Sequence, residues 1–316
     1  MPQAICILGG TGFVGHHLAA RLAHDGHSLT ILTRSRTRHR DLLVLPTASV
    51  KQDDIHQPDV LERHFQGCDT VINLVGILNE KGRDGRGFTH AHVELVRKIL
   101  DACQKTNVRR LLHVSALKAD AEAGPSYYLR SKGQAEDLIR AHPDLNYTIF
   151  RPSIIFGPDD SSTNRFASLL KWMPIFPLAR PNARSAPVYI DDVVDAMTAA
   201  LEDPGTYQNV YQLCGPQVYS LKELVALVAR TLGIKRWVIG LPDSLSRLQA
   251  AMLDFWPGKP FSTDNYRSLG VHSLCEEDGF AALGLSPRPL EIILPQYLRG
   301  GGRQRRLSLF RQDAGR

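Results

Sequence analysis

Three glycines near the N-terminus constrain this chain of 316 residues more than any other feature. Gly9, Gly12 and Gly15 lie directly after the apolar run 4–8 and at the start of the helical pattern 13–24. In a strand–turn–helix unit, the first glycine permits the tight turn, the second lets the backbone approach a pyrophosphate, and the third lets the helix pack against the strand. The N–H groups at the helix N-terminus would bind the phosphates. The motif therefore predicts a dinucleotide site.

The rest of the first half repeats this alternation of apolar strand and amphipathic helix. We expect strands at 28–33, 49–52, 70–75, 110–114 and 147–150, and helices at 59–66, 89–106 and 127–142. Near-continuous apolar strands linked by helices indicate a parallel sheet that helices cover on both faces. Because such crossovers are right-handed, the predicted fold class is α/β, a doubly wound parallel sheet of the Rossmann type.

A change of pattern after Arg151 indicates a second region, because six prolines between residues 152 and 187 punctuate it. We expect residues 1–157 to form the dinucleotide-binding domain, which residues 186–214 complete. The predicted smaller C-terminal cap, which would surround the substrate, comprises residues 158–185 and 215–299. Residues 300–316 are rich in glycine and arginine, and we expect a basic, disordered tail there.

The end of the second strand bears on the choice of dinucleotide. NAD-specific folds place an acidic residue there to hold the ribose hydroxyls. Here the strand leads into residues 34–40, which contain four arginines and no acid. Since a guanidinium can clamp a 2′-phosphate with two hydrogen bonds, we expect NADP(H), with Arg34 and Arg38 as contacts. NAD(H) bound beside a merely solvated basic loop is the alternative.

Later motifs, in order, resemble the short-chain dehydrogenase/reductase superfamily, on its extended and atypical side. The resemblance is carried by residues 9–15, 53–55, 68–76, 151–158 and 188–193. Residues 92–94, 113–117, 128–132 and 283–298 resemble a narrower group, the bacterial relatives of the NAD(P)H-binding alpha-subcomplex subunit nine of mitochondrial complex I. Members of that group are often labelled nucleotide-sugar epimerases or dehydratases.

The resemblance implies where a cofactor would be held. The predicted contacts, besides the arginines, are Gly9, Thr11, Gly12, Phe13, Val14, Gly15, Asp54, Ile55, Val75, Gly76, Ser115, Tyr128, Lys132, Pro152 and Ile154. It also implies tight NADPH binding in a subunit that is structural within complex I.

Tyr128 and Lys132 form the candidate catalytic pair, because residues four apart share one face of a helix. The resemblance implies that the tyrosine is the general acid/base, and a nearby ammonium would favour its phenolate. Ser115 is the candidate for binding the substrate oxygen. However, the extended branch would place that serine about two residues later, where this sequence has Leu117. Without a positioned donor, hydride transfer would lose a main electrostatic contribution.

Three functions are therefore compatible with the sequence. The first is an oxidoreductase, or an enzyme resembling nucleotide-sugar epimerases and dehydratases, acting on a small molecule that the sequence does not identify. The second is a non-catalytic protein that holds NADPH as an assembly, structural or redox-sensing module of a respiratory complex. The third is a peripheral factor of quinone or isoprenoid metabolism.

The formal net charge of +6 comes from two local features rather than from a basic surface. Residues 34–40 contribute four arginines, and residues 299–316 contribute six arginines against Asp313. With no other basic cluster, nucleic acid is not an expected partner. We expect a cytoplasmic protein, with contact of the tail to the inner membrane or a respiratory complex as an alternative to a solubilising role.

Cysteines, histidines and aromatic residues suggest no further site. The five cysteines have long spacings and no C-x-x-C pair, so we expect free thiols in a reducing compartment. Neighbouring histidines such as His16 and His17 point apart on a helix, so no metal site is expected. The aromatic residues of the second half are expected in the cap core, with an apolar pocket or a lipid-facing surface as the alternative. These are Trp172, Phe176, Trp237, Phe255, Trp256 and Phe261.

Overall fold

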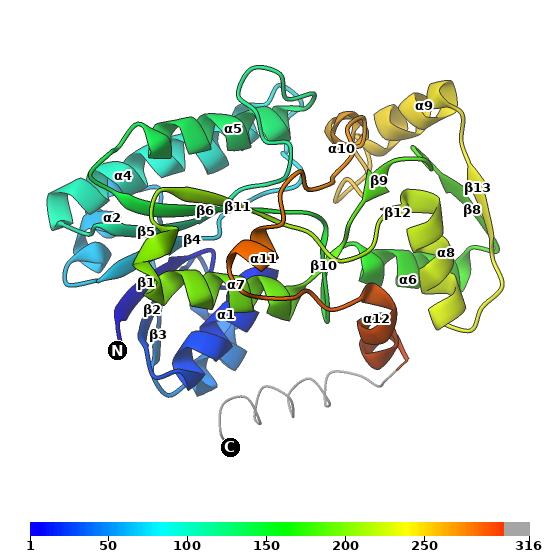
Figure 1. The fold of residues 1–316 in the computed structure, drawn as a ribbon. Coiled ribbons are helices and arrows are strands. Elements are labelled where there is room, and N and C mark those ends of the chain that lie inside the picture. Colours follow the sequence, from blue (N-terminus) through cyan, green and yellow to red (C-terminus); the bar gives the residue numbers. More distant parts are fainter. Residues whose placement is uncertain (300–316) are drawn as a thin grey trace.

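A parallel sheet forms one half of the computed structural model, which describes residues 1–299 (Figure 1). Within these residues the sheet has seven strands in the order β11-β6-β5-β4-β1-β2-β3. The strands are β1 (Ala4–Leu8), β2 (Ser28–Thr33), β3 (Ala48–Gln52), β4 (Thr70–Asn73), β5 (Arg110–Val114), β6 (Asn146–Pro152) and β11 (Asn209–Leu213). The strand order reverses between β1 and β4, where ligands bind in folds of this class. The predicted doubly wound sheet is confirmed.

Helices cover both faces of this sheet. Helices α1 (Phe13–His24) and α7 (Ile190–Glu202) pack on one face, and their apolar residues share a core with Ile5, Ile7 and Ile31. Helices α2 (Pro58–Phe65), α4 (Leu95–Thr106) and α5 (Tyr127–Arg140) pack on the other face, over Cys6 and Leu8. Alternate residues of β1 thus enter different cores, as the period of two in a strand requires.

The cap surrounds a separate core of its own. Strands β8 (Ile175–Leu178) and β13 (Trp237–Gly240) pair in parallel. The cap helices are α6 (Thr163–Trp172), α8 (Leu221–Thr231), α9 (Asp243–Leu253), α10 (Thr263–Ser268) and α12 (Leu290–Leu298). In Figure 1 these elements lie on one side of the sheet domain, with β8 and β13 at the far edge.

Short elements connect the larger ones. Two further strand pairs are β7 (Ile155–Phe156) with β10 (Val188–Tyr189), and β9 (Arg184–Ser185) with β12 (Tyr219–Ser220). The remaining helical segments are α3 (Arg86–Phe88), α11 (Gly279–Ala282), the π-helix η3 (Thr89–Glu94) and the 3₁₀-helices η1 (Arg36–Arg38), η2 (Arg40–Val44) and η4 (Pro204–Thr206).

A disulfide links Cys214, just after β11, to Cys275, which precedes α11. The expectation that all five cysteines are free thiols was therefore wrong for these two. They are 61 residues apart in sequence but their Cα atoms are 6.0 Å apart in the fold. A chain spacing of this length says nothing about spatial distance, so only the tertiary structure could reveal the pair. Cys6, Cys68 and Cys103 are free.

The expected aromatic core of the cap was also wrong for most of its members. Phe176 is buried, but Trp172, Trp237, Phe255 and Trp256 are exposed. Aromatic residues carry no periodicity that separates a buried face from an exposed one when the elements are this short. No described helix combines the length and apolar character that crossing a bilayer requires. The predicted basic tail, 300–316, lies outside the described residues.

Candidate dinucleotide and catalytic site

The glycine loop after β1 has the shape that a pyrophosphate requires. Gly9 has a φ of 77°, and a Cβ atom there would lie 2.9 Å from the carbonyl carbon of Leu74. A Cβ atom on Gly15 would lie only 2.4 Å from the Cα of Gly10, so α1 contacts the turn directly. Helix α1 starts after Gly12 with neither a side-chain cap nor an acidic residue in its first turn. Its first N–H groups are therefore available to an anion, and this cradle fits a dinucleotide.

The other predicted cofactor contacts lie at the same edge of the sheet. Because the paired strands run in parallel, their carboxyl ends meet there. Thr11, Phe13 and Val14 follow β1, Arg34 and Arg38 follow β2, Asp54 and Ile55 follow β3, Val75 and Gly76 follow β4, Ser115 follows β5, and Pro152 and Ile154 lie at the end of β6. The fold thus brings together the segments that the sequence places apart.

The arginine loop after β2 presents free positive charge at this edge. Arg34, Arg36, Arg38 and Arg40 are exposed, and within residues 1–299 none of their guanidinium groups forms an ion pair. Asp54 is exposed nearby after β3, and the N–H of His56 donates to it at 3.0 Å. This hydrogen bond lowers the pKa of the Asp54 carboxyl, which therefore stays ionised at neutral pH.

A polar cluster next to the arginine loop was missed by sequence reasoning. His16 donates from Nδ1 to the carbonyl of Gly12 at 2.8 Å, and its Nε2 lies 3.0 Å from Asp41. The ring centroids of His39 and His16 are 5.8 Å apart. Each of His16, His39 and Asp41 offers one atom of the kind that binds metal ions, and these three atoms lie within 4.8 Å of one another. No sequence signal could show it, because α1 and the loop after β2 meet only in the fold.

Lys132 lies between the ends of two central strands. Its Nζ donates to the carbonyl of Val114 at 2.9 Å and to that of Val75 at 3.3 Å. A Cβ atom on Gly76 would lie 3.5 Å from this Nζ, so the loop after β4 passes directly over the ammonium group. Burial lowers the pKa of Lys132 to about 8, although Glu136 opposes the shift.

Tyr128 lies one helical turn before Lys132, at the start of α5. Its ring makes edge-to-face contacts with Phe88 and His92 at centroid distances of 6.1 and 5.7 Å. Burial raises its pKa to about 12, so the phenol keeps its proton at neutral pH. Ser126 caps the helix by accepting from the N–H of Leu129.

The cap also holds the start of α5. Asp264 of α10 accepts from the backbone N–H of Tyr127 at 2.7 Å and from that of Tyr128 at 3.2 Å. A carboxylate at a helix N-terminus is favourable because the helix dipole is positive there. The position of the candidate acid therefore depends on the cap.

Two buried histidines adjoin Lys132. His92 accepts from the N–H of Ile77 through Nε2, at 3.1 Å, and its Nδ1 lies 2.8 Å from Ser131 Oγ. His113 Nδ1 lies 3.1 Å from the amide nitrogen of Asn73, whereas its Nε2 has no described partner. Burial and the Lys132 ammonium hold the pKa of both imidazoles well below the usual range. Both are therefore neutral near pH 7.

Ser115 takes part in a different network from Tyr128. Its hydroxyl donates to Glu136 Oε1 at 2.5 Å, and this carboxylate is only 1% exposed. Arg151 and Arg140 donate to the same carboxylate at 2.6 and 3.0 Å. Leu117, at the position where the extended branch would have its serine, is buried. The hydroxyl hydrogen of Ser115 therefore points toward a buried carboxylate.

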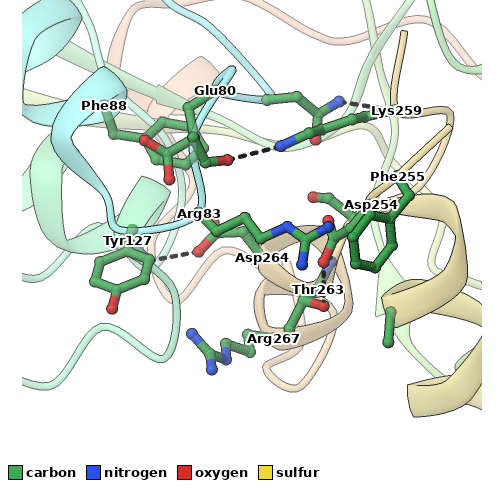
Figure 2. A pocket seen from close by; sticks show the side chains of 14 residues that line it. Glu80, Arg83, Phe88, Tyr127, Asp254, Phe255, Lys259, Thr263, Asp264 and Arg267 are labelled. Atoms are coloured by element: carbon green, nitrogen blue, oxygen red, sulfur yellow. Dashed lines mark hydrogen bonds between the residues drawn. The ribbon is translucent and has the colours of Figure 1, made fainter. Parts of the chain in front are cut away.

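A cavity of about 280 Å³ lies beside α5, between the loop 79–88 and the cap helices α9 and α10. Tyr127 and Phe88 line its sheet side, and Phe255 and Asp264 line its cap side (Figure 2). Lys259 Nζ donates to the carbonyl of Gly82 at 2.7 Å and so joins the loop to the cap. Positive and negative side chains both line the space, which suits a polar or mixed ligand.

With this geometry in view, comparison with known proteins identifies the family. The sequence model of the family described as NAD(P)H-binding matches residues 9–204. The chain belongs to that NAD(P)H-binding family. This match and the relatives described next confirm the predicted resemblance.

Reductases and respiratory subunits are both among the relatives of this chain. A ceramide reductase of Caulobacter vibrioides is 30% identical over 80% of this chain and 78% of its own length. Subunit 9 of the alpha subcomplex of NADH dehydrogenase from Arabidopsis thaliana mitochondria is 29% identical over 93% of this chain and 78% of its own length. UDP-glucose 4-epimerase of Thermus thermophilus, solved with NAD, superposes with a TM-score of 0.74 at 18% identity, covering 95% of this chain and all of its own. At that identity, the likeness concerns the fold alone.

Proposed function

We propose that the chain is an NADP(H)-dependent oxidoreductase that reduces a carbonyl group. The observation that carries this proposal is the placement of Tyr128 and Lys132 one turn apart on α5, at the carboxyl ends of β4 and β5. Lys132 there faces the loop at Gly76, and the ring of Tyr128 contacts Phe88, which lines the cavity. A substrate in that cavity would lie between the dinucleotide edge and the cap.

The protonation states of the two side chains favour reduction over oxidation. Bound NADPH supplies the hydride in such a reaction. Tyr128 is protonated at neutral pH because burial raises its pKa, so it can donate to the oxygen of a carbonyl. Lys132 can hold ribose hydroxyls, and its ammonium would stabilise the phenolate that remains after the proton is given.

The preference for NADP(H) is part of the same proposal. The unpaired guanidinium groups of Arg34 and Arg38 support it, because a 2′-phosphate would give them the anionic partner they lack. An acidic residue that would select the free ribose hydroxyls does not follow β2 directly.

A second candidate function is a non-catalytic protein that holds NADPH, bound to a respiratory complex. It is favoured by the engagement of Ser115 with Glu136, which leaves the substrate oxygen without the expected hydroxyl donor. It also agrees with the similarity of the chain to mitochondrial subunits of NADH dehydrogenase. In this function the cavity beside Tyr127 would contact a partner or stay closed.

Turnover experiments on the purified chain separate the two functions. NADPH oxidation is followed with ketones, quinones and nucleotide sugars, with product analysis to detect epimerisation without net oxidation. For the reductase, Tyr128→Phe should lower kcat by roughly 10²–10⁴-fold and leave NADPH affinity unchanged. Tyr211→Phe on β11, which does not line the cavity, is the matched control and should retain activity. Bound NADPH that no compound oxidises, in wild type and Tyr128→Phe alike, would support the holding function instead.

A further inference from the structure

The outer face of the β8–β13 pair carries large apolar side chains that no described residue covers. Phe176 and Leu178 point into the cap core, whereas Ile175 and its partner in the neighbouring strand, Trp237, point outward. Trp237 is 74% exposed, and Trp172 at the end of α6 is 88% exposed. We call Trp172, Ile175, Trp237 and Ile239 the β8–β13 surface. The segments that carry the two indoles adjoin, because the N–H of Trp237 donates to the carbonyl of Pro174 at 3.1 Å, and two largely exposed indoles on adjoining segments are unusual for a monomer surface.

Helix α9 carries a further row of exposed apolar side chains. Leu245, Leu248 and Met252 are spaced by three and four residues, so they share one side of the helix, and all three are exposed. Helix α9 packs against the β8 end through Gln249, whose amide donates to the carbonyl of Pro177 at 3.2 Å. In Figure 1, α9, β8 and β13 lie at the end of the cap away from the seven-stranded sheet.

Positive charge adjoins the β8–β13 surface. The segments 163–178 and 232–242, which contain β8 and β13, hold four basic residues and no acid. Lys171 precedes Trp172 and Lys235 lies two residues before Trp237; both lysines are exposed, and neither forms an ion pair within residues 1–299. Indole rings flanked by lysines are the side chains that favour the boundary between lipid headgroups and acyl chains.

We propose that the β8–β13 surface docks the cap on an anionic lipid bilayer. The basic residues would lie among the headgroups, and the rings of Trp172 and Trp237 would enter the interface below them. A second copy of the chain fits this surface less well, because two such surfaces would bring the same unpaired positive charges together. The proposal concerns where the chain binds, and it does not depend on whether the chain is an enzyme.

The cavity lies at the other end of α9 from the β8–β13 surface. Helix α9 starts just after β13, whereas Phe255, which lines the cavity, follows its C-terminal end. Phe255 is 77% exposed, and Arg83 stacks on its ring at 3.7 Å. The docking surface and the cavity are therefore separate features of the cap, so variants of one leave the lining of the other unchanged.

Flotation with vesicles of phosphatidylcholine, with and without phosphatidylglycerol, tests the docking. Wild type should float with the anionic vesicles, and Trp172→Ser/Trp237→Ser should bind them at least tenfold more weakly with unchanged thermal unfolding. Lys171→Gln/Lys235→Gln should lower affinity for the anionic vesicles roughly thirtyfold, because the two lysines contribute independently to the binding free energy. The matched control is Leu43→Ser/Val44→Ser, which removes exposed apolar residues beside the arginine loop and should leave binding unchanged.

Three results would overturn the proposal. Wild type could fail to bind either kind of vesicle. Binding could persist in the tryptophan variant and vanish in a chain truncated after Arg299, which would assign the membrane contact to the tail. Sedimentation could show a dimer that the tryptophan variant dissociates, without vesicle binding.

Discussion

The sheet half and the cap expose different chemistry to their surroundings. At the carboxyl edge of the sheet, the available groups are backbone N–H groups of α1 and the guanidinium groups of residues 34–40. At the β8–β13 surface of the cap, the exposed groups are indole rings and aliphatic side chains, with lysines beside them. The first set suits a phosphorylated ligand, and the second suits an apolar surface. The difference teaches that cofactor recognition depends on backbone geometry at one edge, whereas the cap determines what else the chain contacts.

The two regions are nevertheless joined where the candidate chemistry lies. Asp264 of the cap holds the N-terminus of α5, and the disulfide fixes the segment before α11 to the end of β11. Variants in each region should therefore show how separate the two regions are.

Removing the covalent link should have the largest effect on stability. Cys214→Ser/Cys275→Ser should lower the free energy of unfolding by about 4 kcal/mol, because the bond closes a long loop in the unfolded chain. Urea denaturation of the oxidised protein measures it, with Cys68→Ser as the control. A double variant as stable as wild type would show that non-covalent contacts alone join the segment to the sheet.

The buried ammonium group of Lys132 should lower the free energy of unfolding at neutral pH. Its pKa is lowered from 10.5 to about 8 in the folded chain, so folding disfavours its proton. Below pH 8 the penalty is complete, and wild-type stability should rise between pH 8 and 10.5, since the unfolded chain binds more protons there. Lys132→Met should therefore be more stable than wild type by about 3 kcal/mol at pH 7, with the gap closing toward pH 10.5.

Denaturant midpoints measured across this pH range, alongside NADPH titrations, check the lysine prediction. The same variant should bind NADPH more weakly, so that stability and binding change in opposite directions. A variant that loses stability at pH 7 would mean that the two carbonyl hydrogen bonds outweigh desolvation of the ammonium group.

A side chain added in the glycine loop should weaken NADPH binding by the sheet half and leave the cap unchanged. Gly15→Val places carbon atoms where backbone atoms of Gly10 already lie, so the turn must move away from α1. NADPH affinity measured by calorimetry should fall roughly 100-fold. Gly26→Asn, in open space just beyond the end of the same helix, is the control, and asparagine tolerates its left-handed conformation. Vesicle flotation should be unchanged, and its loss would contradict separate roles for the two regions.

The smallest expected effect concerns the choice of dinucleotide. Arg34→Asp should weaken NADPH binding roughly tenfold while NADH binding stays the same or improves, because one guanidinium partner of the 2′-phosphate is lost. Arg40→Asp is the matched control at the end of the same loop. Equal affinities of the wild type for NADH and NADPH would refute the interpretation of the arginine loop.

Much of the sheet half could be predicted because each of its signals is local. The turn at Gly9, the close packing at Gly15 and the apolar strands all follow from neighbouring residues, and the parallel arrangement then places the strand ends together. The pairing of Ser115 with Glu136 could not be predicted in the same way, because it depends on how α5 packs against β5. The cluster of His16, His39 and Asp41 likewise depends on contact between segments that are distant in sequence.

The sequence alone determined the fold class, the phosphate cradle and the position of Tyr128 and Lys132, since short-range geometry in strands, turns and helices sets them. The tertiary structure alone decided that Cys214 and Cys275 are bonded, that the Ser115 hydroxyl faces the interior, and that the tryptophans of the cap point outward. The physical reason is that burial and pairing depend on which elements pack together. That packing is a property of the whole chain, and the spacing of residues along it does not record it.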